Sequence, residues 1–450
     1  MDFLIMDIYE IGTYGLTVFL IAGVIFWYLR KAKSLSQVTA NKVEIAKESG
    51  RFEPISLYPH IDPLTCIGSG ACVSACPEKD VLGLMNARGT LINTTSCIGH
   101  GACFEACPVD AISLRIGTEK RGVDLPHVNP DYQTNVDGIY IAGELGGMGL
   151  IKNSIEQGIE AVNGIHSRCK NKTIEIGETD VLNLLVVGAG PAGIGAALRA
   201  KELGLSYTVL EQESLGGTVF TYPRSKVVMT HPVDLPLYGE VKLTNTTKEE
   251  LLAIWEDIRT TYNLNIREGM KVESVQPEQD YFNIELADGS STKAHNVLLA
   301  IGRRGTPRKL NVPGELSTKV AYRLLDAEHI EGERILVVGG GDSAVESAML
   351  LMEQNSVYLS YRKGAFARIK AGNQTLIDKA IEDKALEVLF ESQVQKIDAD
   401  DVYLKQNDED LKLEDIDRIY IFAGGELPTQ FLQKAGITME LAKNKVLKKH

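Results

Sequence analysis

The chain has 450 residues, enough for two or three domains, and 44% hydrophobic and 24% charged residues, as in ordinary globular proteins. Its formal net charge of −13 argues against nucleic acid as a partner, because phosphate binding requires a basic surface. Seven cysteines are too few for a disulfide scaffold. Six of them fall between Cys66 and Cys107, which is typical of metal-ligand thiols in a reducing compartment.

The first predicted element is a membrane-spanning helix. The run from Ile11 to Leu29 has no charged residue, and as a helix it would extend about 28 Å, close to the hydrocarbon thickness of a bilayer. Acidic residues precede the run, and Arg30, Lys31 and Lys33 follow it. The positive-inside rule therefore predicts a single-pass anchor in the cytoplasmic (inner) membrane, with the catalytic body in the cytoplasm. A cleavable signal peptide is the alternative, but the basic residues that it needs before the apolar run are absent.

A duplicated cysteine motif follows a polar segment that is expected to be a spacer. CIGSGACVSACP begins at Cys66 and CIGHGACFEACP begins at Cys97, and the two are identical at nine of twelve positions. A repeat of this size cannot bury a core alone. The two halves are therefore expected to pack on each other around whatever the cysteines bind.

The next predicted unit is a strand, a glycine-rich turn and a helix. Gly188, Gly190 and Gly193 form GxGxxG, and Glu211 ends the following strand. The glycines let backbone N–H groups and the helix N-terminus reach a pyrophosphate, and Glu211 can accept a hydrogen bond from a ribose hydroxyl. This combination predicts a dinucleotide-binding domain.

A second unit of the same kind begins near residue 334. Gly339, Gly341 and Ala344 form the turn, but Arg362 and Lys363 stand where the first unit has its acid. Cations at that point suit a 2′-phosphate, which favours NADPH over NADH. The alternative is that the two residues are solvated surface charges.

Taken together, these residues resemble the two-dinucleotide-binding-fold flavoprotein reductases of the thioredoxin-reductase type, in particular the bacillithiol-disulfide-reductase-like branch. VLLAIGRRGTPRKLNVPGE from Val297 and IYIFAGGELP from Ile419 are further matches. The resemblance implies FAD in the first domain and NADPH in the second. The residues implied for FAD are Gly188, Gly190, Pro191, Ala192, Gly193, Glu211, Gly217, Gly302, Gly143 and Glu144, and those for NADPH are Gly339, Gly341, Ala344, Arg362, Lys363 and Arg368.

The order of the segments departs from that family. Its last FAD-contacting element has the form TNVxGIYxAGD and lies at the C-terminus, whereas TNVDGIYIAGELGG stands here at Thr134 to Gly147, before the first glycine-rich turn. The reductase therefore resembles a circular permutation, with Glu144 in place of the family's aspartate. The family's redox cysteines have no counterpart, since residues 181–450 contain no cysteine.

The duplicated motif resembles bacterial two-cluster ferredoxins, whose half-motif is C-x2-C-x2-C-x3-C-P. Ser69 and His100 replace the second cysteine of each half. The resemblance implies one iron–sulfur cluster on Cys66, Cys72 and Cys107 and another on Cys97, Cys103 and Cys76. Each is either [4Fe–4S], with Ser69, His100 or a water molecule as a candidate fourth ligand, or [3Fe–4S]. A zinc site and a degenerate ferredoxin with partly empty sites are the alternatives.

The expected fold class is α/β, with two doubly wound nucleotide-binding domains (FAD and NADPH), a small α+β ferredoxin-like domain and one N-terminal transmembrane helix. The expected function is membrane-anchored electron transfer between NADPH, FAD and the clusters, in either direction. The alternatives are a low-molecular-weight disulfide reductase and a membrane redox sensor. No catalytic side chain is predicted, the electron donor or acceptor is unidentified, and a homodimer is allowed. The expected boundaries are 1–33 for the anchor, 34–58 for a linker, 59–118 for the ferredoxin-like domain, 119–165 for the permuted element, 181–305 and 306–428 for the FAD and NADPH domains, and 429–450 for a C-terminal tail.

Overall fold

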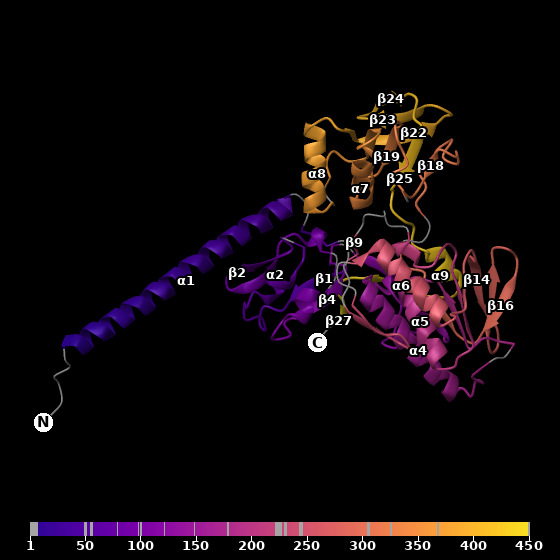
Figure 1. The fold of residues 1–450 in the computed structure, drawn as a ribbon, viewed down its shortest axis with the longest axis horizontal. Coiled ribbons are helices and arrows are strands. Elements are labelled where there is room, and N and C mark those ends of the chain that lie inside the picture. Colours follow the sequence, from indigo (N-terminus) through magenta and orange to yellow (C-terminus); the bar gives the residue numbers. More distant parts are fainter. Residues whose placement is uncertain are drawn as a thin grey trace. The chain divides into compact units, whose positions relative to one another are not determined.

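The computed structural model divides into two compact units, 1–121 with 444–450 and 122–443. Figure 1 shows the chain coloured along its sequence. The residues that the structure describes are 8–48, 52–54, 57–78, 80–97, 99, 101–120, 122–147, 149–177, 180–220, 227–228, 232–242, 246–303, 307–324, 326–366 and 369–448.

The first unit contains a long helix, a small antiparallel sheet of order β1-β4-β27, and a β2–β3 hairpin. The two cysteine motifs lie in loops and short helices between these strands. The elements are α1 (Ile8–Glu48), β1 (Tyr58–Ile61), α2 (Ala71–Ala75), β2 (Leu82–Met85), β3 (Arg88–Leu91), α3 (Ala102–Glu105), β4 (Ile112–Ile116) and β27 (Lys445–Lys448).

Helix α1 has two halves with different environments. Its apolar half is exposed, and by length and composition the helix could cross a membrane. Its second half carries Thr39, Val43 and Ala46, which are buried against the hairpin side of the unit. The helix therefore continues to Glu48, where the sequence suggested a spacer. The helical spacing of these three residues is weak in the sequence, because the more hydrophobic Val38 and Ile45 beside Thr39 and Ala46 are exposed.

The C-terminal strand belongs to the first unit. Strand β27 pairs antiparallel with β4, and the Tyr58 hydroxyl donates a hydrogen bond of 2.9 Å to the side chain of Asn444, 386 residues away. The segment 429–450 was expected to be a tail, but it contains the helix α9 and the strands β26 and β27. Val446 and Leu447 stand among lysines and give only a weak strand pattern in the sequence.

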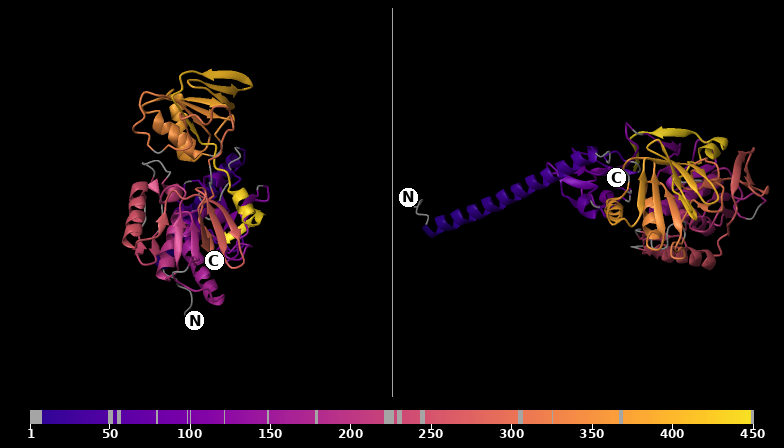
Figure 2. Two further views of the ribbon diagram at one scale, coloured as in Figure 1. Left: turned by 90° about the vertical axis from the view of Figure 1, so that its right-hand side faces the viewer. Right: turned by 90° about the horizontal axis from the view of Figure 1, so that it is seen from above.

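The second unit begins with a domain built on a parallel five-stranded sheet of order β13-β8-β7-β17-β6. Figure 2 shows the whole chain in two further views, with the colours of Figure 1. Its elements are β5 (Val123–Pro126), β6 (Ile139–Ile141), α4 (Ile151–Asn171), β7 (Leu184–Val187), α5 (Pro191–Glu202), β8 (Tyr207–Leu210), β9 (Val227–Val228), β10 (Val233–Leu235), β11 (Gly239–Val241), β12 (Thr246–Thr247), α6 (Lys248–Thr261), β13 (Ile266–Arg267), β14 (Val272–Pro277), β15 (Phe282–Leu286), β16 (Ser291–Ala294), β17 (Val297–Leu299), α9 (Thr429–Lys434) and β26 (Met439–Ala442).

The apolar run of β7 explains how this sheet is covered on both faces. Leu184 and Val186 pack in the core formed with α4, α5 and α6, whereas Leu185 and Val187 pack in the core formed with β14, β15 and α9. A strand that is buried on both sides is continuously hydrophobic, as expected in a parallel sheet.

The other domain of this unit has a second parallel sheet, of order β18-β25-β19-β20-β21. Helices α7 and α8 cover one face and the three-stranded sheet β22-β23-β24 covers the other. The elements are β18 (Val320–Ala321), β19 (Arg334–Val338), α7 (Asp342–Leu351), β20 (Ser356–Tyr361), α8 (Ala371–Glu382), β21 (Glu387–Phe390), β22 (Ser392–Ile397), β23 (Val402–Gln406), β24 (Glu409–Leu413) and β25 (Arg418–Ile421). The predicted α/β fold with two nucleotide-binding domains is confirmed.

Two glycines let α4 approach α5 at backbone distance. A Cβ at Gly158 would overlap the carbonyl oxygen of Ala192, and a Cβ at Gly195 would lie 2.7 Å from the carbonyl oxygen of Ile155. Strand β6 just before α4 pairs in parallel with β17. The segment before the first glycine-rich turn is therefore an integral part of the domain that follows it.

We predict that Gly158→Ala destabilises the first nucleotide-binding domain, because the new methyl group must push α4 away from α5. The melting temperature should fall by about 2–8 °C. Gly164→Ala is the matched control on the same helix, since its Cβ would lie 3.6 Å from the nearest atom, the Asp131 carbonyl oxygen. It should be neutral or slightly stabilising, because alanine is the better helix former. Equal melting temperatures for the two variants would contradict the tight contact.

Candidate functional site

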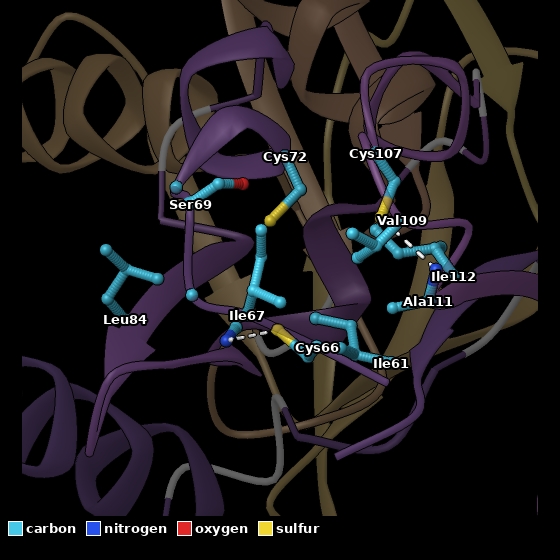
Figure 3. Close-up of a pocket in the computed structure, with 13 residues that line it drawn as sticks. Ile61, Cys66, Ile67, Ser69, Cys72, Leu84, Cys107, Val109, Ala111 and Ile112 are labelled. Carbon is cyan, nitrogen blue, oxygen red and sulfur yellow. Dashed lines mark hydrogen bonds between the residues drawn. The ribbon is translucent and has the colours of Figure 1, made fainter. Parts of the chain in front are cut away.

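Three cysteines from separate segments line one pocket in the first unit. Cys66 precedes α2, Cys72 lies within it and Cys107 follows α3, and all three line the same small pocket (Figure 3). Ser69 lines the same pocket. The structure thus brings together the three thiols and the hydroxyl that the sequence assigns to one cluster.

A second group contains Cys76, Cys97 and Cys103. Burial is the main cause that raises the pKa of the Cys97 thiol to about 11 and that of the Cys103 thiol to about 12, and the neighbouring Cys76 contributes to both shifts. Thiolates at such positions need a compensating positive charge, which metal ions supply. His100, the candidate fourth ligand, lies outside the described residues.

The backbone around both groups suits bound inorganic sulfur. Gly68, Gly70, Gly99 and Gly101 have positive φ, and a Cβ at Gly68 would overlap the backbone of the β2–β3 turn. Two backbone N–H groups point at sulfur in the first pocket: that of Gly89 lies 3.4 Å from Cys66 Sγ and that of Ala111 lies 3.3 Å from Cys107 Sγ. Such N–H contacts set the properties of iron–sulfur clusters.

The geometry disfavours a single metal ion. Among the described residues, no three His, Cys, Asp or Glu side chains converge closely enough to hold one ion. A zinc site requires that convergence. The thiolates of a cluster bind different irons, so they can stand farther apart. The three-thiol groups therefore fit a cluster better than zinc.

The first nucleotide site lies at the carboxyl end of β7. Gly188 has φ 104°, and its Cβ would lie 2.6 Å from the Ala300 carbonyl oxygen, while a Cβ at Gly193 would overlap the Gly188 carbonyl oxygen. Gly190 caps α5, with Pro191 at the first helical position, and its Cβ would meet no atom within 4 Å. The helix N-terminus is therefore open to a pyrophosphate.

Glu211, at the end of β8, is 6% exposed and supports this turn. Its carboxylate accepts hydrogen bonds from the backbone N–H groups of Ala189 (2.7 Å) and Glu213 (2.9 Å). Burial raises the pKa of Glu211, and these hydrogen bonds oppose the shift. Each carboxylate oxygen has a further lone pair, so a ribose hydroxyl can still be bound.

Several loops converge on the same edge of the sheet. Gly143 follows β6, and its Cβ would lie 3.3 Å from Cβ of Ala192; a Cβ at Gly217 would lie 3.3 Å from Cα of Gly190. Gly302 follows β17 with φ 65°. Ligands of open α/β sheets bind at the carboxyl ends of the strands, which is where these glycines lie.

Two residues near this edge were not found from the sequence. Gln157 Oε1 accepts a hydrogen bond of 2.8 Å from the Gly143 N–H. Burial lowers the pKa of Arg303, and the carboxylate of Glu144 opposes that shift, so the two charges are neighbours. In the sequence, the arginine that directly follows Gly302 in IGRR was a signal only in combination with Glu144.

The second nucleotide site has the same design at the end of β19. A Cβ at Gly339 would lie 2.6 Å from the Phe422 carbonyl oxygen, Gly341 caps α7 with open space around it, and Ala344 is fully buried. Arg362 and Lys363 are exposed directly after β20. Arg368 lies outside the described residues.

Tyr361 is a feature of this site that the sequence did not reveal. A Cβ at Gly340 would overlap its ring, and the ring stacks on Phe366 with centroids 5.4 Å apart. The aromatic pair thus closes one side of the glycine-rich turn. The only signal was a tyrosine immediately before the two cations.

Two family profiles match the chain. Residues 185–450 match the pyridine nucleotide-disulphide oxidoreductase family, and residues 58–108 match the 4Fe-4S dicluster domain. The ferredoxin–NADP reductase of Thermus thermophilus is 29% identical over 280 residues, covering 59% of this chain and 80% of that protein. The ferredoxin–NADP reductase of Ignicoccus hospitalis is 31% identical over 183 residues, covering 40% of this chain and 57% of that protein.

The fold also matches a solved structure. The bacillithiol disulfide reductase of Staphylococcus aureus aligns with a TM-score of 0.51 and 20% identity, covering 58% of this chain and 81% of that one. At this identity the likeness concerns the fold alone.

We predict that Gly190→Ala and Gly193→Ala both impair FAD binding, but for different physical reasons. At Gly190 the methyl group projects into open space with φ −74°, so the apoprotein should keep its stability while FAD affinity falls about tenfold or more. At Gly193 the methyl group overlaps the Gly188 carbonyl oxygen, so the fold itself should be destabilised. Calorimetry of apoprotein and FAD titration separate the two effects. Gly341→Ala is the control, and it should retain full FAD content; FAD loss there would contradict the assignment.

Proposed function

Since the chain belongs to the pyridine nucleotide-disulphide oxidoreductase family, we propose that it is a membrane-anchored enzyme that passes electrons between NADPH, FAD and two iron–sulfur clusters. The observation that carries this proposal is the pairing of two three-thiol groups with a reductase region, residues 181–450, that contains no cysteine. A dithiol relay within the reductase is therefore absent, and the duplicated cysteine motif offers the alternative electron route. Its relatives named ferredoxin–NADP reductase support the same class of reaction.

The residues have binding and positioning roles in this proposal. The open N-termini of α5 and α7 receive the two pyrophosphates, and Glu211 receives a ribose. Bound FAD would accept a hydride and release single electrons, which iron–sulfur clusters carry one at a time. The N–H groups of Gly89 and Ala111 would stabilise negative charge on the sulfurs of Cys66 and Cys107.

Membrane anchoring is supported by the apolar half of α1. Arg30 and Lys31 lie over the rings of Phe26 and Trp27, at 5.7 and 5.0 Å from the ring centroids. Aromatic and basic residues are enriched at membrane–water interfaces. The second half of the helix packs into the first unit, which favours a retained anchor over a cleaved signal.

The order of segments supports a circular permutation of the reductase. The family match begins at residue 185, yet β6 and α4 lie before it and complete the same sheet and core. In the proposal, Gly143 and Glu144 face the flavin from this upstream segment.

An activity assay distinguishes the proposal from a disulfide reductase. The purified chain should oxidise NADPH steadily with ferricyanide, a one-electron acceptor, and show no turnover with low-molecular-weight disulfides. Disulfide-dependent turnover would favour the reductase alternative, and FAD content without turnover would favour a redox sensor.

We predict that Arg362→Ala raises the KM for NADPH and leaves the KM for NADH unchanged. A charge-assisted contact to the 2′-phosphate is worth roughly 1.5–3 kcal/mol, which corresponds to a change of roughly 10- to 150-fold. Lys379→Ala, an exposed lysine on α8 of the same domain, is the control and should change neither constant. Equal loss for both nucleotides would refute the assignment.

We predict that Cys72→Ala removes one cluster, so iron and acid-labile sulfide should fall by about half while FAD content is retained. Cys169→Ala is the matched control, because Cys169 is buried in α4 and hydrogen-bonded to Asn296. It should keep all of its iron. Unchanged iron in Cys72→Ala would exclude the first pocket as a cluster site.

The iron count also tests the fourth ligands. About eight irons per chain correspond to two [4Fe–4S] clusters and about six to two [3Fe–4S] clusters. If Ser69 and His100 are ligands, Ser69→Ala and His100→Ala should each lower a count of eight. A count of six that neither variant changes would show that they are not.

A further inference from the structure

A loop beside the first cysteine group exposes two large apolar side chains. Leu64 is 92% exposed and Ile67 is 64% exposed, and Cys66 lies between them. The loop has a fixed conformation, because Asp62 accepts hydrogen bonds from the Leu64 N–H (2.9 Å), the Thr65 hydroxyl (2.6 Å) and the Cys66 N–H (3.0 Å). We call residues 62–67 the apolar loop.

The apolar loop lies near the membrane-side part of α1. A Cβ at Gly68 would overlap the Ala87 carbonyl oxygen, and the neighbouring Asn86 N–H donates a hydrogen bond of 3.1 Å to the Ser36 hydroxyl. Ser36 follows Arg30 by six residues, or about 9 Å along a helix. The headgroup layer is about 5–8 Å thick on each side of the hydrocarbon. Ser36 therefore lies just beyond this layer, and an apolar side chain that extends from the loop by a few ångströms toward the apolar half of α1 would reach the headgroups.

The second cysteine group lies farther along α1. Lys42 forms an ion pair with Asp80, at the end of the hairpin opposite its turn, and the Asp80 carbonyl oxygen accepts from the Asn93 N–H. Cys97 follows Asn93 after one turn of 3₁₀ helix. The two groups thus stand at different distances from the apolar half of the helix.

We infer that the apolar loop inserts into the headgroup layer of the bilayer and makes the Cys66/Cys72/Cys107 group the membrane-proximal one. This inference rests on the proposed membrane anchor. Exposed apolar side chains bind at the interface when basic residues accompany them, and Arg30, Lys31, Lys33 and Arg88 are all exposed. The contact involves only the apolar loop, so the acidic body of the chain, with its net charge of −13, does not have to lie against the membrane surface. An electron carrier held in the bilayer would meet this group first.

Spin labels test the placement in the full chain. Spin labels are attached to Leu64→Cys and Ile67→Cys in a protein that also carries Cys169→Ala. Bound iron protects the cluster cysteines from the label. The iron content is measured to confirm that the unit is intact. The protein is reconstituted in vesicles of phosphatidylcholine and phosphatidylglycerol. Collisions with oxygen, which enters the bilayer, are compared with collisions with a water-soluble nickel chelate. Both labels should show an oxygen-to-nickel ratio severalfold above that of a label at Leu316→Cys, which lies in the second unit and is 87% exposed.

A label at Phe19→Cys, in the apolar half of α1, separates the two proposals. Suppose that this label lies in the bilayer, and that labels at residues 64 and 67 show the same low oxygen-to-nickel ratio as the label at residue 316. The inference about the loop is then wrong, and the proposed membrane anchor is supported. If residue 19 is also aqueous, both are wrong. If labels at 64 and 67 are shielded from both reagents, a second copy of the chain covers the loop, and the bilayer contact is likewise excluded.

Discussion

The close approach of α4 and α5 is the contact on which the nucleotide-binding domain depends. The absence of side chains at Gly158 and Gly195 lets the two backbones meet. This contact fixes α5, whose N-terminus is the floor of the first nucleotide site, and it holds the segment that carries β6 and Gly143 against the same sheet. An element from before the glycine-rich turn can therefore serve a site that is otherwise built from residues after it.

The cysteine-rich unit depends in a similar way on one physical constraint, which is the cost of ionising buried thiols. Six thiols stand in two groups, each with a buried member, Cys72 or Cys103. Burial and neighbouring thiolates raise the pKa of both, so the thiols stay protonated at neutral pH until metal replaces the protons. Cofactor and fold are thus linked: the unit has small elements and a short sheet, and bound iron would supply cross-links that its modest core lacks.

The sequence was informative where one residue type has one physical role. Cysteines at fixed spacing and glycines such as Gly188 and Gly193 have few substitutes, so their partners could be predicted and the structure brings them together. Packing through ordinary residues was not predictable. Thr39 and Ala46 add little to any hydrophobic periodicity of the sequence. Tyr361 packs against Gly340 through a contact that exists only in the folded domain. His100 and Arg368 lie outside the described residues and stay predictions.

The return of β27 to the first unit has a consequence for how the chain is made. Helix α1 and both cysteine motifs are synthesised before the nucleotide-binding domains, whereas β27, which completes the sheet of β4, is synthesised after them. Long-range pairings of this kind form slowly. During synthesis the edge of β4 that will pair with β27 therefore stays unpaired while the nucleotide-binding domains are made. If the proposed anchor and clusters are present, iron loading and membrane insertion would both begin on a unit whose last strand is synthesised only after the two nucleotide-binding domains.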